Sequence, residues 1–380
     1  MSASTLFAPR QSRLSLPQRL RHLDWLIVLL LAGIAGIGVA MLYSVANGDF
    51  SPWAARHAFR FAAGLALLLA AAMVDIRTWL MLAWPAYLGA LILLGAVDVI
   101  GVVGMGSRRW LDLGVFQLQP SELMKVTTVL AIARYYHGLG ADEAQRFVRV
   151  LIPLLLIALP TGLVMVQPDL GTGLLILAAG VVVIFLGGAS KWLFIGGGAL
   201  TLAAIPVGWS FLRDYQKSRV LSFLNPESDP LGAGYQVMQS KIALGSGGVD
   251  GKGFLDGTQS HLNFLPEMKT DFIFTVLAEE FGLLGGLFVL MLYAILIFYG
   301  LRVALLCRSQ FGRLLAAGLA ATLFLHVFIN VAMVMGLLPV VGVPLPLISY
   351  GGTIMMTTLL SFGILLSVSL DHRVVIPRGV

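Results

Sequence analysis

Long apolar stretches restrict the fold of this chain more than any other feature. The first runs from Trp25 to Leu42 without one charged residue. A stretch of about 18 or more apolar residues is long enough to cross a bilayer as a helix. Similar stretches lie at about 57–75, 77–98, 120–137, 150–167, 170–190, 192–212, 272–301, 314–338 and 346–370. The sequence therefore predicts an all-α integral membrane protein with about ten transmembrane helices.

Composition excludes the main alternatives to a membrane protein. Of the 380 residues, 58% are hydrophobic and 12% are charged, whereas a soluble domain is about a quarter charged. A soluble enzyme, a fibrous protein and a disordered chain are therefore excluded. The net charge of +6 would suggest nucleic acid in a soluble protein. In a membrane protein, basic loops orient the helices, so we expect no nucleic-acid partner.

Basic residues also predict how the chain is oriented. With the N-terminus in the cytoplasm, 14 of the 25 Lys and Arg residues fall in cytoplasmic segments. Six of the other 11 lie in one long loop, where the positive-inside rule is weak. We expect cytoplasmic tails at residues 1–24 and 372–380, and a single membrane domain at 25–371. The single cysteine, Cys307, excludes an intramolecular disulfide.

The long loop, residues 213–271, lies outside the membrane between the seventh and eighth predicted helices. Loops of this length are usually functional or disordered. Because this one retains apolar residues such as Phe223, Tyr235 and Ile242, we expect it to fold as a cap over a cavity. Its segment 245–253 resembles a phosphate-binding loop but does not match the motif. Ser246 stands where the first glycine is required, and Gly253 stands where Ser or Thr must follow Lys252, so hydrolysis of ATP or GTP is not expected.

Polar side chains at membrane depth are costly and need a reason. Glu122 and Lys125 share a helix face at i, i+3, and they either serve a substrate or lock two helices together. Asp169 and Asp271 each stand at a predicted helix start, where a carboxylate is also favoured by the helix dipole alone. Other polar residues are expected to be structural: Glu279, Glu280, and the i, i+4 pair His326 and Asn330.

The predicted topology brings many charged residues to the outer membrane level from four separate segments. Arg108 and Arg109, beside Trp110, could also be an interfacial anchor. The mixture of cations and carboxylates suits a large anionic, lipid-linked substrate, with cations for phosphate and carboxylates for proton transfer. The residues of this set are Arg108, Arg109, Glu122, Lys125, Asp169, Lys217, Arg219, Lys241, Lys269 and Asp271.

Several long motifs resemble the SEDS (shape, elongation, division, sporulation) family. They occur in order over residues 107–352, together with the ten-helix layout and the large loop. Residues 225–235 are more similar to the rod-elongation branch than to the cell-division branch. The motifs are Ser107-Arg108-Arg109-Trp110-Leu111-Asp112-Leu113-Gly114, Gln119-Pro120-Ser121-Glu122 with Lys125, Gln167-Pro168-Asp169-Leu170-Gly171-Thr172, Phe264-Leu265-Pro266-Glu267 with Thr270-Asp271-Phe272-Ile273-Phe274, Pro344-Leu345-Pro346 and Ser349-Tyr350-Gly351-Gly352.

The resemblance implies a peptidoglycan glycosyltransferase that polymerises lipid II, an undecaprenyl-pyrophosphate disaccharide-peptide, at the outer face of the bacterial cytoplasmic membrane. It places the catalytic base at Asp271. Supporting or substrate-binding roles then fall on Glu122, Lys125, Arg108, Arg109, Asp169, Lys217, Arg219, Lys241 and Thr270. A divalent cation could share the stabilisation of the leaving pyrophosphate. The family usually works with a class B penicillin-binding protein, a transpeptidase, and with other membrane proteins of the elongation complex.

Two rival functions share many of these features. A lipid II flippase would have similar helices, cavity and cations, but it would need substrate access from both faces. A non-catalytic scaffold for the elongation complex is the third interpretation. The predicted concentration of polar residues at the outer face favours the enzyme.

Overall fold

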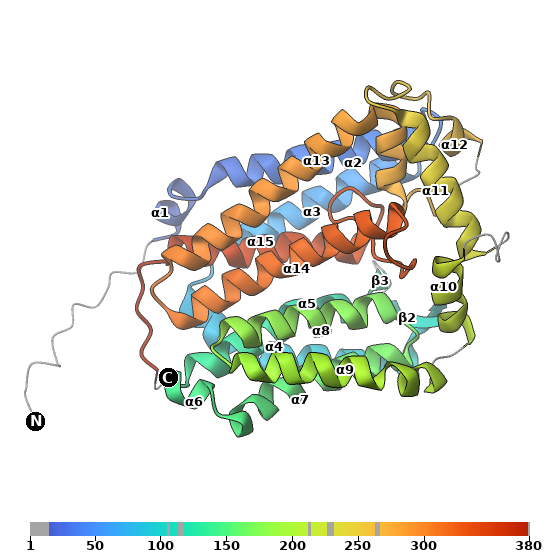
Figure 1. The fold of residues 1–380 in the computed structure, drawn as a ribbon. Helices are drawn as coiled ribbons and strands as arrows, with labels where there is room; N and C mark the ends of the chain where they lie inside the picture. The colour runs from blue at the N-terminus through green and yellow to red at the C-terminus, as the bar shows by residue number, and fades with distance from the viewer. Residues whose placement is uncertain are drawn as a thin grey trace, which may run out of the picture.

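A computed structural model describes residues 15–104, 107–112, 114, 117–211, 214–225, 232–262 and 267–378, and it is a bundle of long helices (Figure 1). The long helices of the bundle are α2 (Trp25–Val45), α3 (Trp53–Met73), α4 (Ile76–Ile100), α5 (Pro120–His137), α7 (Phe147–Val166), α8 (Leu170–Leu186), α9 (Lys191–Phe211), α13 (Ile273–Leu306), α14 (Gln310–Val334) and α15 (Gly352–Leu370). Shorter helices are α1 (Leu16–Arg21), α6 (Ala141–Ala144), α10 (Asp214–Leu224), α11 (Ala233–Gly247) and α12 (Thr258–His261).

Each of the ten predicted transmembrane segments overlaps one of the long helices, so the all-α membrane class is confirmed, although α15 begins at Gly352 rather than at 346. In the described part of the chain, eight helices are long and apolar enough to cross a membrane. The other two are α8, which is apolar but has 17 residues, and α5. Helix α5 is less apolar because it carries Glu122, Lys125, Thr127 and Thr128, all of which are buried inside the bundle. Its surroundings are protein rather than lipid, so it does not need a fully apolar surface.

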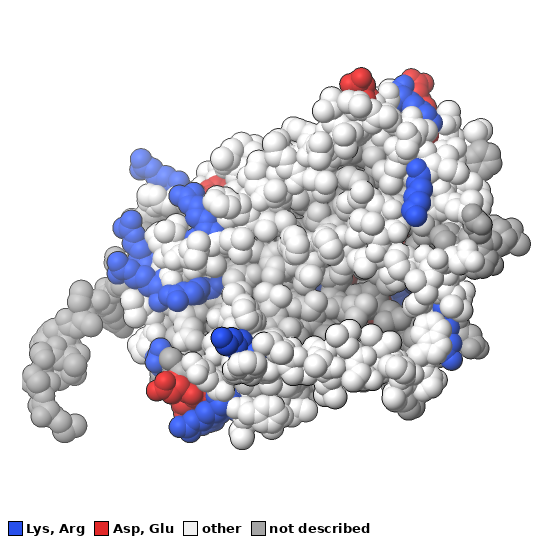
Figure 2. All heavy atoms as spheres, in the orientation of Figure 1, with Lys and Arg blue, Asp and Glu red and all other residues white. Residues whose placement is uncertain are grey.

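Charged side chains lie at the two ends of the bundle on the face drawn in Figure 2, with a wide uncharged band between them. A lipid-facing belt of this kind is what a membrane-spanning bundle requires. Helix α1 and the C-terminal end of the chain lie at one end, and α10, α11 and α12 lie at the other (Figure 1). The first and last described residues, 15 and 378, are therefore on the same side, as an even number of crossings requires.

Capping residues explain where several helices begin. The Asp75 side chain accepts a hydrogen bond from the backbone N–H of Arg77 at the start of α4. The Ser309 hydroxyl accepts one from Gly312 at the start of α14, and α5 has Pro120 at its first turn. These groups satisfy or remove backbone donors that a helix start leaves unpaired.

A small antiparallel sheet connects α4 to α5 at the end that carries α10–α12. Its strands are β1 (Val102–Gly104), β2 (Ser107–Asp112) and β3 (Gln117–Leu118), in the order β1-β2-β3. Val103 pairs with Arg108, and Leu111 pairs with Leu118. The Arg108-Arg109 motif is therefore on a strand at the end of the bundle.

The long loop folds into helices rather than forming a linker. Helices α10, α11 and α12 lie across one end of the bundle (Figure 1), and α11 packs against α13 and α14. The buried Ser240 hydroxyl on α11 lies 2.7 Å from the Val334 carbonyl and 2.9 Å from the Thr275 hydroxyl. Parts of the predicted loop, residues 213, 226–231 and 263–266, lie outside the described residues.

The glycine-rich segment 245–253 is inserted into a break in α13. At Gly282 the backbone is left-handed, with φ of 64°, which favours glycine. The N–H groups of Leu283 and Leu284 donate to Gly248 and Val249, at 3.0 and 3.2 Å. The carbonyls of Glu279 and Glu280, their usual acceptors in a helix, accept instead from Lys252 and Gly253, at 3.1 and 2.9 Å. The loop thus replaces two helical hydrogen bonds of α13.

Candidate active site

Asp271 lies immediately before α13 and is held by its backbone. Its carbonyl accepts a hydrogen bond of 2.8 Å from the Asn330 side chain on α14. The preceding carbonyl, of Thr270, accepts one from the Ser349 hydroxyl, and the Lys269 carbonyl accepts one from the Tyr350 N–H. Helix α14 and the segment before α15 therefore fix the backbone of residues 269–271, while the half-buried Asp271 carboxyl makes no hydrogen bond within the described residues.

Burial raises the pKa of Asp271 from its ordinary value of 3.8 to about 7, with Glu267 and Asp169 contributing in the same direction. Arg219 and Arg109 lower the pKa and only partly offset this. These residues come from four separate segments of the chain. The predicted convergence at one end of the bundle is thus observed for Arg109, Asp169, Arg219 and Asp271. A carboxyl with a pKa near working pH is suited to accept a proton during a reaction.

Asp169 is a buried carboxylate at the start of α8. It accepts hydrogen bonds from the Thr172 N–H at 3.2 Å and from the Gln119 side chain at 3.1 Å. Arg109 donates to the carbonyls of Gln167 and Pro168, so it fixes the turn that leads into Asp169. Capping of α8, which the sequence left as an alternative, is confirmed. Capping and a role near Asp271 are compatible, because Asp169 contributes to the pKa of Asp271.

One loop connects the Asp169 turn with Asp271. A Cβ on Gly171 would lie 2.6 Å from the Val341 carbonyl, so α8 begins in close contact with that loop. A Cβ on the next loop residue, Gly342, would lie 3.4 Å from Oδ2 of Asp271. Segment 341–342 therefore contacts both the start of α8 and the Asp271 carboxyl.

Glu122 and Lys125 form a second polar group deeper in the bundle. Lys125 Nζ lies 2.7 Å from Oε1 of Glu122 and 2.6 Å from Nε2 of His326 on α14. Nδ1 of His326 lies 2.8 Å from the Thr322 carbonyl, and the Thr357 hydroxyl on α15 lies 3.2 Å from Oε2 of Glu122. The ion pair therefore connects three helices, as the structural alternative requires.

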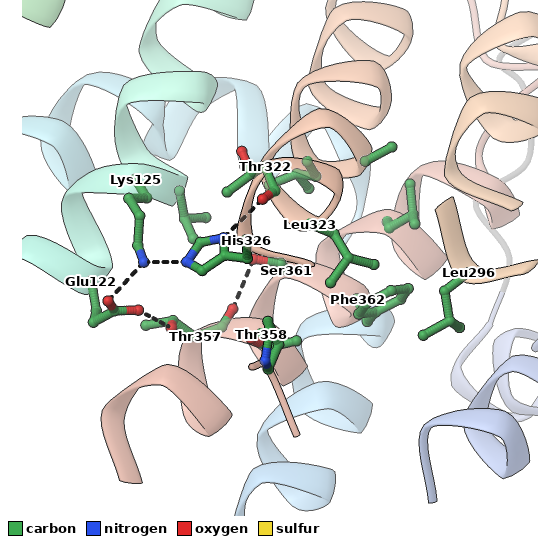
Figure 3. Close-up of a pocket in the computed structure, with 15 residues that line it drawn as sticks. Glu122, Lys125, Leu296, Thr322, Leu323, His326, Thr357, Thr358, Ser361 and Phe362 are labelled. Atoms are coloured by element: carbon green, nitrogen blue, oxygen red, sulfur yellow. Dashed lines mark hydrogen bonds and ion pairs between the residues drawn. The ribbon is translucent and has the colours of Figure 1, made fainter. Parts of the chain in front are cut away.

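These same groups also line a cavity, as a substrate role requires (Figure 3). The cavity contains about 510 Å³ of empty space, including the part that opens outward. One wall carries Glu122, Lys125 and His326, and the opposite side is apolar, with Leu296, Leu323 and Phe362 (Figure 3). The lining thus offers a cation on one side and apolar contacts on the other. Its lining comes from α5, α13, α14, α15 and Pro346, and none of it comes from α10–α12 in the described part of the chain.

The side chains of the remaining predicted residues make no hydrogen bond to the Asp271 carboxyl or the Lys125 ammonium within the described residues. Arg108 is exposed and donates to the Asp98 carbonyl at 3.3 Å, so it anchors the sheet to α4. Lys241 is exposed and lies against Gly336. Lys217 is half-buried on α10, and we find no hydrogen bond or ion pair for it among the described residues. Thr270 donates to Glu267, with Oγ1 2.9 Å from Oε2.

Glu279 and Glu280 have structural partners, as expected. Glu279 pairs with Lys252 at 2.6 Å, and Glu280 accepts from the Ser44 hydroxyl. Both carboxylates stand beside the break in α13. Among the described residues, no group of three or more His, Cys, Asp or Glu side chains is arranged to hold a metal ion.

His326 and Asn330 were expected to be structural, and the structure places both beside the candidate site. The i, i+4 spacing put them on one face of α14, but it did not indicate their partners. His326 contacts Lys125, and Asn330 contacts the Asp271 backbone. Ser349 was included in a family motif, and Thr357 was missed because a lone threonine in an apolar helix carries no recognisable signal.

Comparison with known proteins gives matches over nearly the whole chain. Residues 21–374 match the profile of the FtsW/RodA/SpoVE family, described as cell cycle protein. Peptidoglycan glycosyltransferase MrdB of Escherichia coli K12 is 45% identical over 361 residues, covering 94% of this chain and 96% of that protein. Stage V sporulation protein E of Bacillus subtilis is 35% identical, covering 92% and 98%. A probable peptidoglycan glycosyltransferase FtsW of Geobacter sulfurreducens is also 35% identical, covering 93% and 96%.

Solved structures are similar over the same length. One similar chain is 36% identical, with a TM-score of 0.79. It comes from a solved structure described as the structural coordination of polymerization and crosslinking by a peptidoglycan synthase complex. The rod shape determining protein RodA of Thermus thermophilus is 31% identical, with a TM-score of 0.70. Each comparison covers 92% of this chain and 98% of the other.

Proposed function

This chain belongs to the FtsW/RodA/SpoVE family, and we propose that it is a peptidoglycan glycosyltransferase that polymerises lipid II. The proposal rests above all on Asp271, whose backbone is fixed by α14 and the segment before α15 and whose carboxyl has a pKa of about 7. The identity of 45% to MrdB, against 35% to the FtsW and sporulation relatives, supports the elongation branch.

Asp271 is the general base in this proposal. The 4-hydroxyl oxygen of the acceptor GlcNAc attacks the anomeric carbon of the donor MurNAc, and Asp271 takes the hydroxyl proton. The bond from the anomeric carbon to the pyrophosphate oxygen breaks, and undecaprenyl pyrophosphate leaves with that electron pair. A positioned base contributes about 10²–10⁴-fold. Arg109 and Arg219, which both act on Asp271, are cations that can stabilise the developing negative charge.

The cavity beside Lys125 is the second part of the proposed substrate site. Its polar wall presents the Lys125 ammonium to an anionic head group, and its apolar side provides a surface for part of a polyprenyl chain. Glu122 compensates the Lys125 charge, with Oε1 2.7 Å from Nζ. The lone cation would otherwise carry a large desolvation cost inside the bundle.

The reaction would take place at the outer face of a bacterial cytoplasmic membrane, with both chain ends in the cytoplasm. Helices α10–α12 and the start of α13, which Asp271 precedes, lie at the end opposite α1, and this arrangement supports the orientation. A class B penicillin-binding protein would supply crosslinking, in an elongation complex. The similarity to a chain of a peptidoglycan synthase complex supports such a partner.

Purified protein and lipid II in liposomes test the proposal. The partner is added in a form that lacks transferase activity, so any glycan strand must come from this chain. Formation of strands longer than one disaccharide is expected. Movement of lipid II between leaflets without polymerisation would identify a flippase instead, and the absence of both activities would favour a scaffold.

A further inference from the structure

His326 is a buried histidine whose two ring nitrogens both have defined neighbours. Nδ1 lies 2.8 Å from the Thr322 carbonyl. A carbonyl oxygen can only accept a hydrogen bond, so Nδ1 carries the hydrogen. Nε2 lies 2.6 Å from the ammonium nitrogen of Lys125, which can only donate. Nε2 therefore has a free lone pair, and the imidazole is neutral with its hydrogen on Nδ1.

Lys125 has three N–H donors, and two of them are occupied. One points to Oε1 of Glu122 at 2.7 Å, and another points to Nε2 of His326. No partner for the third is found within the described residues. Because the first two bonds come from different helices, α5 and α14, they fix the rotation of the ammonium group about its Cε–Nζ bond. The direction of the third N–H is consequently determined as well.

Figure 3 places these groups along one wall of the cavity. Glu122 and His326 lie on either side of Lys125, and the apolar residues Leu323, Phe362 and Leu296 lie beyond them. A fixed N–H donor beside an apolar cavity is a site for one anionic oxygen attached to an apolar chain. Within the proposed function, the matching chemistry is a phosphate of a polyprenyl-linked donor.

We propose that His326 is a positioning residue for this site: its Nε2 accepts one N–H of Lys125 and so directs the remaining N–H toward an oxygen of a polyprenyl-linked phosphate. The inference rests on the proposed function for the identity of the ligand. It assigns His326 a role that acts only through Lys125. A merely structural His326 would join α14 to α5 with no effect on the ligand.

The test uses the full chain in detergent and undecaprenyl pyrophosphate as the probe, with binding followed by intrinsic tryptophan fluorescence. His326→Phe keeps a ring but removes both nitrogens, and we expect Kd to rise about tenfold, the value of one charge-assisted hydrogen bond. His326→Gln offers an amide oxygen to Lys125 and should restore most of the affinity. His137→Phe removes a buried histidine from the far end of α5 and should leave Kd unchanged.

A double-mutant cycle separates positioning from packing. In a Lys125→Met background, His326→Phe should cause no further change in Kd, because there is no ammonium left to direct. An equal tenfold loss in both backgrounds would overturn the inference, as would an unchanged Kd in the single variant. Equal losses in the Phe and Gln variants would also overturn it, since they would assign the effect to packing of the ring.

A measurement on the wild-type protein needs no variant of His326 to fold. In ¹⁵N-histidine NMR, Nε2 of His326 should resonate as an unprotonated nitrogen, and its signal should shift in Lys125→Met. A protonated Nε2 would overturn the inference. These readouts measure probe binding and protonation, so they do not depend on polymerisation. A wild-type protein that does not polymerise lipid II would contradict the proposed function but not this inference.

Discussion

The raised pKa of Asp271 has two opposing effects on its action as a base. Burial raises its pKa to about 7, which strengthens it as a base but also keeps part of the population protonated at neutral pH. Arg109 and Arg219 lower the pKa and so preserve an ionised fraction. The same burial makes ionisation cost stability as pH rises from about 4 to about 7, because the unfolded chain ionises first.

The pH dependence of polymerisation follows from this. A base must be deprotonated to act, so kcat/KM should rise with pH through a midpoint near the Asp271 pKa of about 7. Initial rates of lipid II polymerisation between about pH 5.5 and 8.5 measure the profile. A rate that is flat over this range would contradict a raised pKa for Asp271.

The buried pair Glu122–Lys125 is predicted to be functional as well as structural. The double variant Glu122→Gln with Lys125→Met removes both charges, so it leaves no lone buried charge. We expect polymerisation to fall by about 10²-fold or more, with Tm changed by only a few degrees. Full activity in this variant would show that the pair serves only to join α5, α14 and α15.

Among the elements, α13 is unusual because another segment completes its hydrogen bonds. At Gly282 a Cβ would lie 2.3 Å from the Val249 carbonyl, so a side chain there requires the inserted loop to move. The segment 245–253, which failed as a nucleotide loop on sequence grounds, is glycine-rich because its backbone contacts the backbone of α13 closely. Its function in this structure is to couple α11 and α12 to α13.

Gly282→Ala should destabilise the protein by about 1–3 kcal/mol, from the left-handed φ and the close contact. The matched control is Gly33→Ala on α2, where a Cβ meets nothing within 4 Å; there alanine should be neutral or slightly stabilising. Thermal unfolding of the purified variants measures both. Equal Tm values for the two variants would contradict the inserted arrangement of the loop.

Most of the helices were predictable because each apolar stretch had to span a membrane. The start of α5 and its end matched the prediction at residues 120 and 137. The break at Gly282 was not predictable, since its cause is a loop 30 or so residues earlier. For the site, Asp271, Asp169 and Arg109 each stand in a motif that is visible in the sequence. The contact between Lys125 and His326 depends on how α5 packs against α14, and no local sequence pattern indicates that packing.

At the scale of the whole molecule, the polar site lies at one end of a bundle whose lipid-facing surface is uncharged on the face that Figure 2 shows. Helices α10–α12 lie across that end, and Arg219 on α10 reaches the surroundings of Asp271. A movement of these helices would therefore alter the base directly. A partner that binds them can regulate the reaction by favouring one of two arrangements.

Hydrogen exchange tests this regulation. When a penicillin-binding partner is added, amide exchange across residues 214–225 and 232–262 should fall, while exchange in α14 and α15 stays unchanged. Those two helices provide the internal control, because most of their residues are buried in the bundle. Identical exchange in α10–α12 with and without an activating partner would contradict regulation through this segment.

The central claim, that Asp271 is the base of a lipid II polymerase, is tested most directly by one comparison. Wild-type and Asp271→Asn proteins are purified and reconstituted with lipid II and the transferase-inactive partner, and strand length is measured by gel electrophoresis. Asparagine is nearly isosteric but cannot take the proton, so the variant should lose about 10²-fold or more of the rate while its Tm at pH 8 is no lower than wild type. Strand synthesis at the wild-type rate by folded Asp271→Asn protein would contradict the account.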